Sequence, residues 1–136
     1  KNAEKSVVMT GYSISDYFTG MLDTIIAKSQ QGVYVRFYVN DIEKSRASLV
    51  KMLAYRSKYL QFFEYEKNSD DKMAASHAKI LTIDSDKSLV SSANLSYHGL
   101  SGNIEMGFLV RSADKAKQIE ELLKELVRMH VYKKIS

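Results

Sequence analysis

Residues 77–105 read HAKILTIDSDKSLVSSANLSYHGLSGNIE, and this stretch decides the fold prediction for the 136-residue chain. Two short runs rich in Ile, Leu and Val flank the polar segment Asp-Ser-Asp-Lys at 84–87. Apolar β-branched runs on either side of such a segment are typical of a β-hairpin. We therefore predict two strands, at 78–83 and 88–93, joined by a tight turn.

The polar residues of this stretch have spacings that place them on shared faces. Successive side chains of a strand point to opposite sides, so His77 and Lys79 can project together. Ser92 and Asn94 can do the same from the next strand. An imidazole nucleophile with cationic and amide donors for phosphate oxygens is a set that can cleave a phosphodiester without a metal. Glu105 stands among apolar neighbours, where a carboxylate needs a partner, and the imidazole N–H of His77 suits that role.

The order and spacing of these residues resemble the HKD motif of the phospholipase D superfamily, H-x-K-x4-D-x6-G-S-x-N. The motif is matched at five positions, namely His77, Lys79, Asp84, Ser92 and Asn94. Ser91 stands where the family usually has Gly, a residue that allows closer backbone approach. The resemblance extends from about residue 6 to about residue 130, and the layout is similar to that of small bacterial nucleases with a single HKD motif.

The resemblance implies a phosphodiesterase that forms a phosphohistidine on His77 and uses neither a metal nor a cofactor. It implies that Lys79, Ser92 and Asn94 hold the phosphate oxygens and that Glu105 orients the imidazole. The superfamily brings two HKD motifs together, so that a second His protonates the leaving group and then activates water. A single motif therefore implies a homodimer. The alternative is a second HKD repeat elsewhere in a longer parent chain.

The sequence also suggests roles for three further residues. Asp84 lies at an odd offset from His77 and beside the turn, so we expect it to point away and to act as a structural anchor. Tyr12 closes the first predicted strand, at a sheet edge where α/β folds bind ligands, and is a candidate substrate-binding residue. His98 belongs to the loop after Asn94, where capping its own turn is the expected role.

Elsewhere the hydrophobic periodicity alternates between strands and helices. Strands are predicted at 6–13, 33–38, 60–65 and 105–110, and helices at 16–31, at 41–58 and from Ser112 onward. The last of these helices would include His130 and carry Leu122 and Leu123 on its apolar side. Helical crossovers and one hairpin predict an α/β fold with a mixed, mainly parallel sheet flanked by helices on both faces.

Composition sets broader limits. Apolar residues make up 45% of the chain, and no apolar run reaches the roughly 18–20 residues of a membrane span, so we expect no stable membrane insertion. The absence of Cys excludes disulfides and thiolate metal sites and fits the cytoplasm, with a removed export signal as the alternative. The chain begins at Lys1, so we treat 1–136 as a single domain excised from a longer chain.

The sequence indicates the type of reaction more clearly than it indicates the substrate. A net charge of +4 favours a polyanionic partner. Together with the compact single-motif layout, this favours a nuclease acting on DNA, and the segment 94–107 is similar to PLD-like proteins of bacterial DNA-processing and defence systems. One alternative is a phospholipid phosphodiesterase or transphosphatidylase. Another is a non-catalytic module for dimerisation or nucleic-acid binding, against which the intact set of His77, Lys79 and Asn94 argues.

Overall fold

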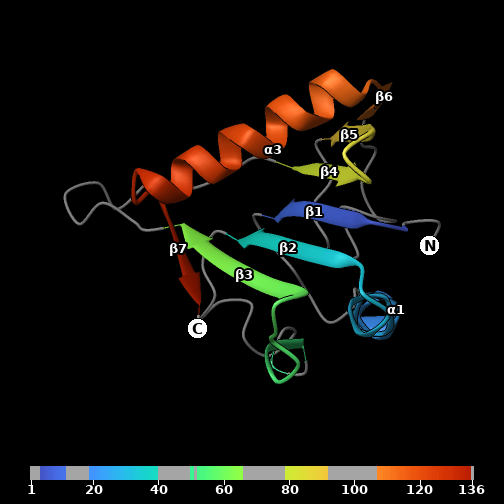
Figure 1. Cartoon of the computed structure of the whole chain (residues 1–136), viewed down its shortest axis with the longest axis vertical. Helices are drawn as coiled ribbons and strands as arrows, with labels where there is room; N and C mark the ends of the chain where they lie inside the picture. The colour runs from blue at the N-terminus through green and yellow to red at the C-terminus, as the bar shows by residue number, and fades with distance from the viewer. Residues whose placement is uncertain are drawn as a thin grey trace.

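The computed structural model describes residues 4–11, 19–39, 50, 52–65, 79–91 and 107–135. In these ranges seven strands form one sheet in the order β6-β5-β4-β1-β2-β3-β7 (Figure 1). The strands are β1 (Ser6–Gly11), β2 (Tyr34–Val39), β3 (Leu60–Tyr65), β4 (Ile80–Ile83), β5 (Lys87–Ser91), β6 (Gly107–Arg111) and β7 (Tyr132–Ile135). Two long helices accompany the described sheet, α1 (Thr19–Gln30) and α3 (Ala113–Arg128).

Parallel pairing is confined to the centre of the sheet. β1 pairs with β2, and β2 with β3, in parallel register, so that Val8, Arg36 and Gln61 form a row across the three strands. The other described pairings, β1–β4, β4–β5, β5–β6 and β3–β7, are antiparallel. The predicted mixed sheet is therefore confirmed, but the expectation that it is mainly parallel is wrong for the described strands.

The two faces of the sheet build two parts of the core. On one face, Phe37 and Phe62 belong to a buried cluster with Ile26 of α1. On the other face, Tyr38 belongs to a buried cluster with Leu123 of α3. Neighbouring residues of a strand point to opposite sides, so Phe37 and Tyr38 serve different layers. Helices thus cover both faces of the sheet, which confirms that part of the prediction.

α3 is an amphipathic helix with a defined start. The Ser112 side chain accepts a hydrogen bond from the Lys115 N–H at 3.2 Å, which is the cap that the sequence predicts. Along the helix Leu123 is buried, whereas Leu122 is 59% exposed. The expectation that Leu122 faces the core is wrong, because a rotation of about 100° per residue carries it away from the sheet.

The sequence prediction missed β7, which follows α3 and pairs with β3 at the end of the sheet. α3 ends at Arg128, and His130 has a φ of 62°, so His130 turns the chain and does not belong to the helix as expected. The sequence of β7, Tyr-Lys-Lys-Ile, has no strong strand pattern of its own. Its conformation depends on β3, a distant partner that a local pattern cannot indicate.

Most other described boundaries agree within two residues, and the strand at 60–65 coincides with β3. The predicted helix 41–58 extends too far, because the chain turns at 54–55 and Ser57 forms an isolated bridge with Leu60. Two backbone hydrogen bonds between Ser57 and Leu60, at 3.0 and 3.2 Å, reverse the chain into β3. The earlier part of this helix, 41–49, lies outside the described residues.

Candidate active site at one edge of the sheet

Four strand ends that adjoin the predicted site residues lie at the same edge of the sheet. β1 and β5 run toward this edge and end at Gly11 and Ser91, while β4 and β6 run away from it and begin at Ile80 and Gly107. These four strands are direct neighbours, as Figure 1 shows. Their register near the edge is given by the pairs Met9–Leu81, Ile80–Val90 and Ser91–Gly107.

Most of the predicted site residues come just beyond these strand ends in the sequence. Lys79 and Asp84 lie within the described structure. The remaining predicted residues lie outside the described ranges, namely Tyr12, His77, Ser92, Asn94, His98 and Glu105. The structure therefore places the strand ends that lead to the motif, together with two of its members.

Lys79 directly precedes β4 and is half-buried. The start of β4 is held by the Thr10 hydroxyl, which accepts a hydrogen bond from the Ile80 N–H at 2.7 Å and donates one to the Ile80 carbonyl at 3.5 Å. Thr10 is buried near the end of β1. It ties β1 to β4 beside Lys79, a role that sequence analysis missed. The available signal was a hydroxyl residue that closes an apolar run.

Asp84 lies at the other end of β4, roughly 17 Å from Lys79 for five residues of extended chain. Its carboxylate accepts hydrogen bonds from three successive backbone N–H groups, those of Glu4, Lys5 and Ser6, at 3.1, 2.7 and 3.1 Å. The Asp84 N–H donates to the Ser6 carbonyl at 2.8 Å. These contacts fasten the turn after β4 to the start of β1, away from the edge that carries Lys79.

The environment of Asp84 suits an ionised carboxylate in a tight turn. Burial alone would raise its pKa, but the three N–H donors and the nearby Lys5 charge outweigh burial and hold the pKa below its usual value. Asp84 and Ser85 have φ values of 55° and 52°, the left-handed pair that the centre of a type I′ hairpin turn requires. Asp adopts this conformation more readily than most residues.

Within the described ranges, no group of three or more His, Cys, Asp or Glu side chains is placed to hold a metal ion. No helix of the same ranges is both long enough and apolar enough to cross a bilayer. Neither finding concerns the intervening residues, which include His77 and Glu105.

A family model described as "Cardiolipin synthase, PLD-like domain" matches residues 1–127 of the chain. Among curated proteins, the chain is similar to the DISARM protein DrmC of Bacillus paralicheniformis, with 32% identity over 133 residues. This match covers 98% of the chain and 55% of DrmC. The chain thus spans about half the length of the curated relative that it matches.

Solved structures share the fold. The phospholipase D family member Nuc from Salmonella typhimurium matches with a TM-score of 0.75 at 18% identity, over 98% of this chain and 84% of its own. TrmBL2, an archaeal chromatin protein, matches with a TM-score of 0.62 at 15% identity, over 98% of this chain and 47% of its own. At these identities the similarity is one of fold, the mixed sheet flanked by helices.

Proposed function

The chain belongs to the phospholipase D superfamily, and on this basis we propose that it is a metal-independent phosphodiesterase that cleaves DNA. The observation that carries the proposal is the meeting of four strand ends at one edge of the sheet. Each of these ends adjoins a predicted site residue in the sequence. Tyr12 follows β1 and Ser92 follows β5, whereas His77 precedes β4 and Glu105 precedes β6.

Chain connectivity supports the convergence of these groups. The HKD residues other than Asp84, together with Glu105, stand one to three residues from a described strand end. Neighbouring strands lie about 4.8 Å apart, and each residue adds at most about 3.6 Å of chain. The groups are therefore within reach of a single phosphate bound at this edge.

In the proposed reaction the His77 imidazole attacks phosphorus in line with the scissile P–O bond. A P–N bond forms as the P–O bond breaks, and the departing oxygen takes a proton from the imidazole of a second motif. That imidazole then removes a proton from water, whose attack on phosphorus breaks the P–N bond and restores His77. Lys79 balances charge on the phosphate oxygens, Asn94 and Ser92 donate hydrogen bonds to them, and Glu105 fixes the reactive tautomer of His77.

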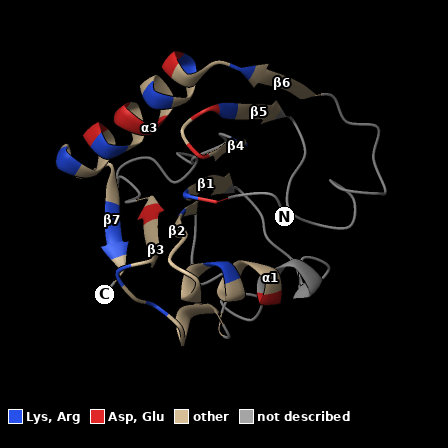
Figure 2. Ribbon diagram, turned by 45° about the vertical axis from the view of Figure 1, so that its right-hand side comes forward, with Lys and Arg blue, Asp and Glu red and all other residues tan. Residues whose placement is uncertain are grey.

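Charge and structural similarity favour DNA as the substrate. The net charge is +4, and Figure 2 shows basic residues on β7, which carries Lys133 and Lys134, whereas basic and acidic residues are equally numerous on α3. TrmBL2, which shares the fold, is a chromatin protein described with a novel mode of DNA binding. The proposal places the enzyme in the reducing cytoplasm, which suits a chain without Cys. A phospholipid is the second candidate substrate, because the matching family description names cardiolipin synthase.

A second HKD motif completes the proposed site, and near the candidate edge β5 and β6 carry exposed apolar residues on both faces of the sheet. Leu89 pairs with Leu109, and Val90 with Phe108, across β5 and β6. All four are exposed, Phe108 to 71%. Covering such residues favours association. We propose a twofold homodimer whose interface includes 92–97. The alternative is a second repeat in a longer parent chain, which the greater length of DrmC favours.

The proposal is tested by nuclease assays in excess EDTA with single-stranded DNA, double-stranded DNA, RNA and phospholipid vesicles. We expect DNA cleavage to persist in EDTA and to be inhibited by orthovanadate, which occupies the phosphate position. His77→Ala should lower the rate by about a thousandfold or more, because deleting a nucleophile costs several orders of magnitude.

His130→Ala is the matched control, because His130 is an exposed histidine in the turn after α3, and it should keep the wild-type rate. Cleavage of phospholipid without cleavage of nucleic acid would favour the second candidate. Loss of DNA cleavage in EDTA that magnesium restores would contradict the metal-independent mechanism. Retention of a tenth of the rate in His77→Ala would contradict the phosphohistidine.

A further inference from the structure

A pair of cationic side chains lies between α3 and the sheet, apart from the candidate active-site edge. Arg36 occupies the middle of β2, between Val8 of β1 and Gln61 of β3. Within the described residues, no hydrogen bond or ion pair engages its guanidinium. Arg36 is half-buried and lines open hollows, so its guanidinium is accessible to a ligand. Arg36 therefore has unused capacity for a ligand.

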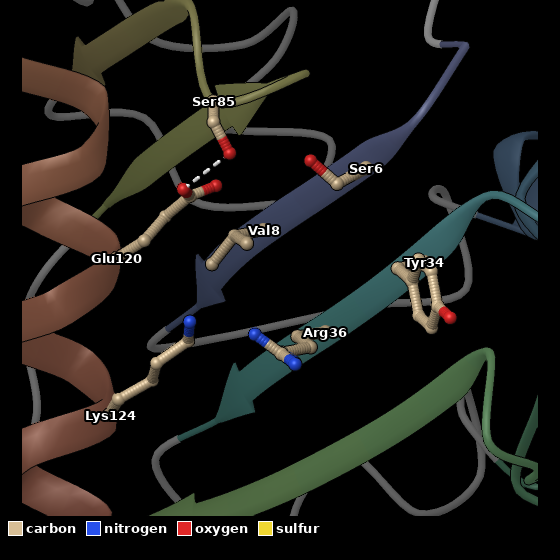
Figure 3. A pocket seen from close by; sticks show the side chains of 7 residues that line it. All are labelled: Ser6, Val8, Tyr34, Arg36, Ser85, Glu120 and Lys124. Carbon is tan, nitrogen blue, oxygen red and sulfur yellow. Dashed lines mark hydrogen bonds between the residues drawn. The ribbon is translucent and has the colours of Figure 1, made fainter. Parts of the chain in front are cut away.

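Lys124 approaches the same region from the helix. It follows Glu120 by one turn of α3, and Figure 3 shows Lys124 and Arg36 extending toward each other beside β1 and β2. Lys124 also forms an ion pair with Glu121 at 3.4 Å. That pair is exposed, and exposed pairs contribute little, so it competes weakly with a bound anion.

Two hollows adjoin this cationic pair, and Arg36 and Lys124 line both. The first, of about 150 Å³, also has Ser6, Ser85 and Tyr34 in its walls. The second, of about 180 Å³, extends past Tyr38 and Gln61. Each exceeds the roughly 10–15 Å³ that one water molecule needs. The cations thus face a space large enough for a polyatomic anion.

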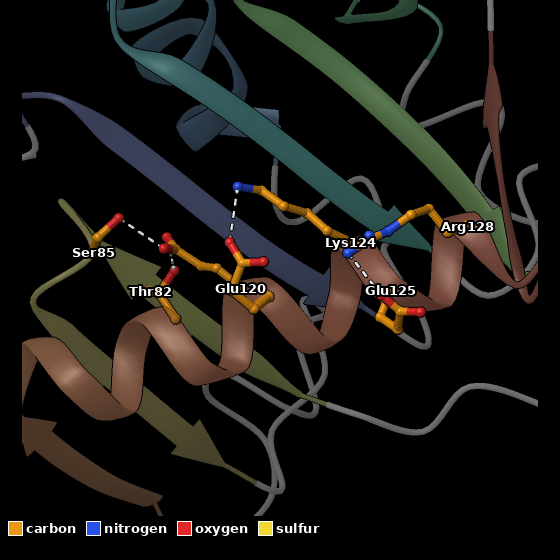
Figure 4. A network of polar contacts seen from close by, with 7 residues as sticks. Thr82, Ser85, Glu120, Lys124, Glu125 and Arg128 are labelled. Carbon is orange, nitrogen blue, oxygen red and sulfur yellow. Dashed lines mark hydrogen bonds and ion pairs between the residues drawn. The ribbon is translucent and has the colours of Figure 1, made fainter.

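The acidic groups beside the hollows are each engaged by other side chains. The Glu120 carboxylate accepts hydrogen bonds from the Thr82 hydroxyl at 3.0 Å and from the Ser85 hydroxyl at 2.7 Å (Figure 4). Glu120 and the Lys124 partner Glu121 together supply two negative charges against the two positive charges. It is therefore the guanidinium of Arg36, unpaired within the described residues, and not a surplus of charge, that favours an anion. Burial raises the pKa of Tyr38 to about 12, although the Arg36 charge acts in the opposite direction, so Tyr38 stays neutral at physiological pH.

We propose that Arg36 and Lys124 form a binding site for the phosphate group of a nucleotide. A guanidinium donates two parallel hydrogen bonds to a phosphate, and an ammonium adds a compact charge. Tyr34 lines the first hollow, is 41% exposed, and contacts the ring of Tyr59 with 4.7 Å between centroids. Exposed aromatic rings beside cations are platforms for nucleobases. The phosphate and the base together define the ligand class.

The site is tested by calorimetric titration of the full chain with dAMP, inorganic phosphate and deoxyadenosine. The protein carries His77→Ala, so that the result does not depend on cleavage at the candidate active site. We expect dAMP to bind, phosphate to bind more weakly, and deoxyadenosine not to bind. Arg36→Gln and Lys124→Gln should each weaken dAMP binding by about tenfold or more, because each removes a charged donor.

Arg128→Gln is the matched control, because Arg128 is an exposed cation of the same helix, paired with Glu125 at 2.7 Å, and it should leave binding unchanged. A shift of the Arg36 Nε–H resonance on addition of dAMP would support the location. Lys124 is an exposed residue of α3, so we expect Lys124→Gln to fold. This variant therefore tests the site even if Arg36→Gln does not fold. Absence of dAMP binding, or equal weakening by Arg128→Gln, would overturn the proposal. Equal affinities for phosphate and dAMP would overturn the assignment to a nucleotide.

Discussion

The carboxylate of Asp84 links the β4–β5 turn to backbone groups up to 80 positions earlier in the sequence. It accepts hydrogen bonds from the backbone N–H groups of Glu4, Lys5 and Ser6, where β1 begins. Hydrogen bonds to an ionised acceptor are stronger than those between neutral groups. One side chain therefore fixes the first strand to the hairpin that follows Lys79.

Removing the charge of Asp84 should destabilise the protein at neutral pH. Asp84→Asn keeps a residue that tolerates positive φ but loses an ionised acceptor, so we expect the free energy of unfolding in urea at pH 7 to fall by about 1–2 kcal/mol. Asp86→Asn is the control, because Asp86 is exposed in the same turn. It should change the free energy by less than about 0.5 kcal/mol.

The same variant has a defined pH dependence. The folded pKa of Asp84 lies below the unfolded value of about 3.9, so its stabilisation is fully present above the unfolded pKa. The stabilisation decreases as the pH falls through that value and is lost below the folded pKa. The difference between wild type and Asp84→Asn should therefore shrink as the pH is lowered from about 5 to about 3. A difference that stays constant over this range would contradict the anchoring role.

At the residue level, the place of Asp84 beside the turn was enough to predict an anchoring role, whereas its orientation relative to His77, which lies outside the described residues, stays a prediction. The partners of Asp84 could not be predicted, because nothing in the sequence of Glu4–Ser6 marks it as a set of donors. Arg36 and Lys124 were missed for a similar reason. They belong to different elements, and only the packing of α3 on the sheet places them beside the same hollows.

At the level of elements, the start of α3 was predictable because capping by Ser112 is local. The width of its buried face was not, since that depends on how the helix lies over Tyr38 and Phe63. Leu123 meets this surface, whereas Leu122, one residue earlier, does not. The hairpin could also be predicted, while β7 depends on a distant strand and could not.

Two leucines of α3 provide a matched test of this arrangement. Leu123→Ala should lower the free energy of unfolding by about 2–4 kcal/mol, because it opens a cavity beneath the helix. Leu122→Ala removes the same atoms from an exposed position and should change it by less than about 0.5 kcal/mol. Urea denaturation measures both. Similar losses at the two positions would mean that α3 is rotated about its axis relative to this structure.

At the level of the whole molecule, the sequence predicted a motif carried on strands but not the order of those strands. The order β6-β5-β4-β1 results from antiparallel pairing on one side of β1, and this order gathers at one edge the four strand ends that adjoin predicted site residues. His77, Ser92, Asn94 and Glu105 lie outside the described residues, so their convergence stays a prediction.

The proposed two-motif site makes a prediction about mixed assemblies. When wild-type subunits are mixed with excess His77→Ala subunits, each mixed dimer keeps one of its two imidazoles. Activity per wild-type subunit should therefore fall as the variant is added, whereas added His130→Ala subunits should not lower it. The measurement is the rate of DNA cleavage after the subunits have exchanged. Full activity of a monomer at nanomolar concentration would contradict the dimer, and an inactive monomer would favour the second repeat.

The position of β1 between β2 and β4 also governs the order in which the protein can fold. β2 follows β1 closely in the chain, but Leu81, the partner of Met9 on the other side, is made some seventy residues after it. During synthesis the parallel trio β1–β2–β3 must therefore wait, with one side of β1 unpaired, until the hairpin emerges from the ribosome. Contacts so distant in sequence form slowly. Until β4 and Asp84 are made, the nascent chain therefore exposes an unpaired side of β1, and such a strand edge is prone to aggregation.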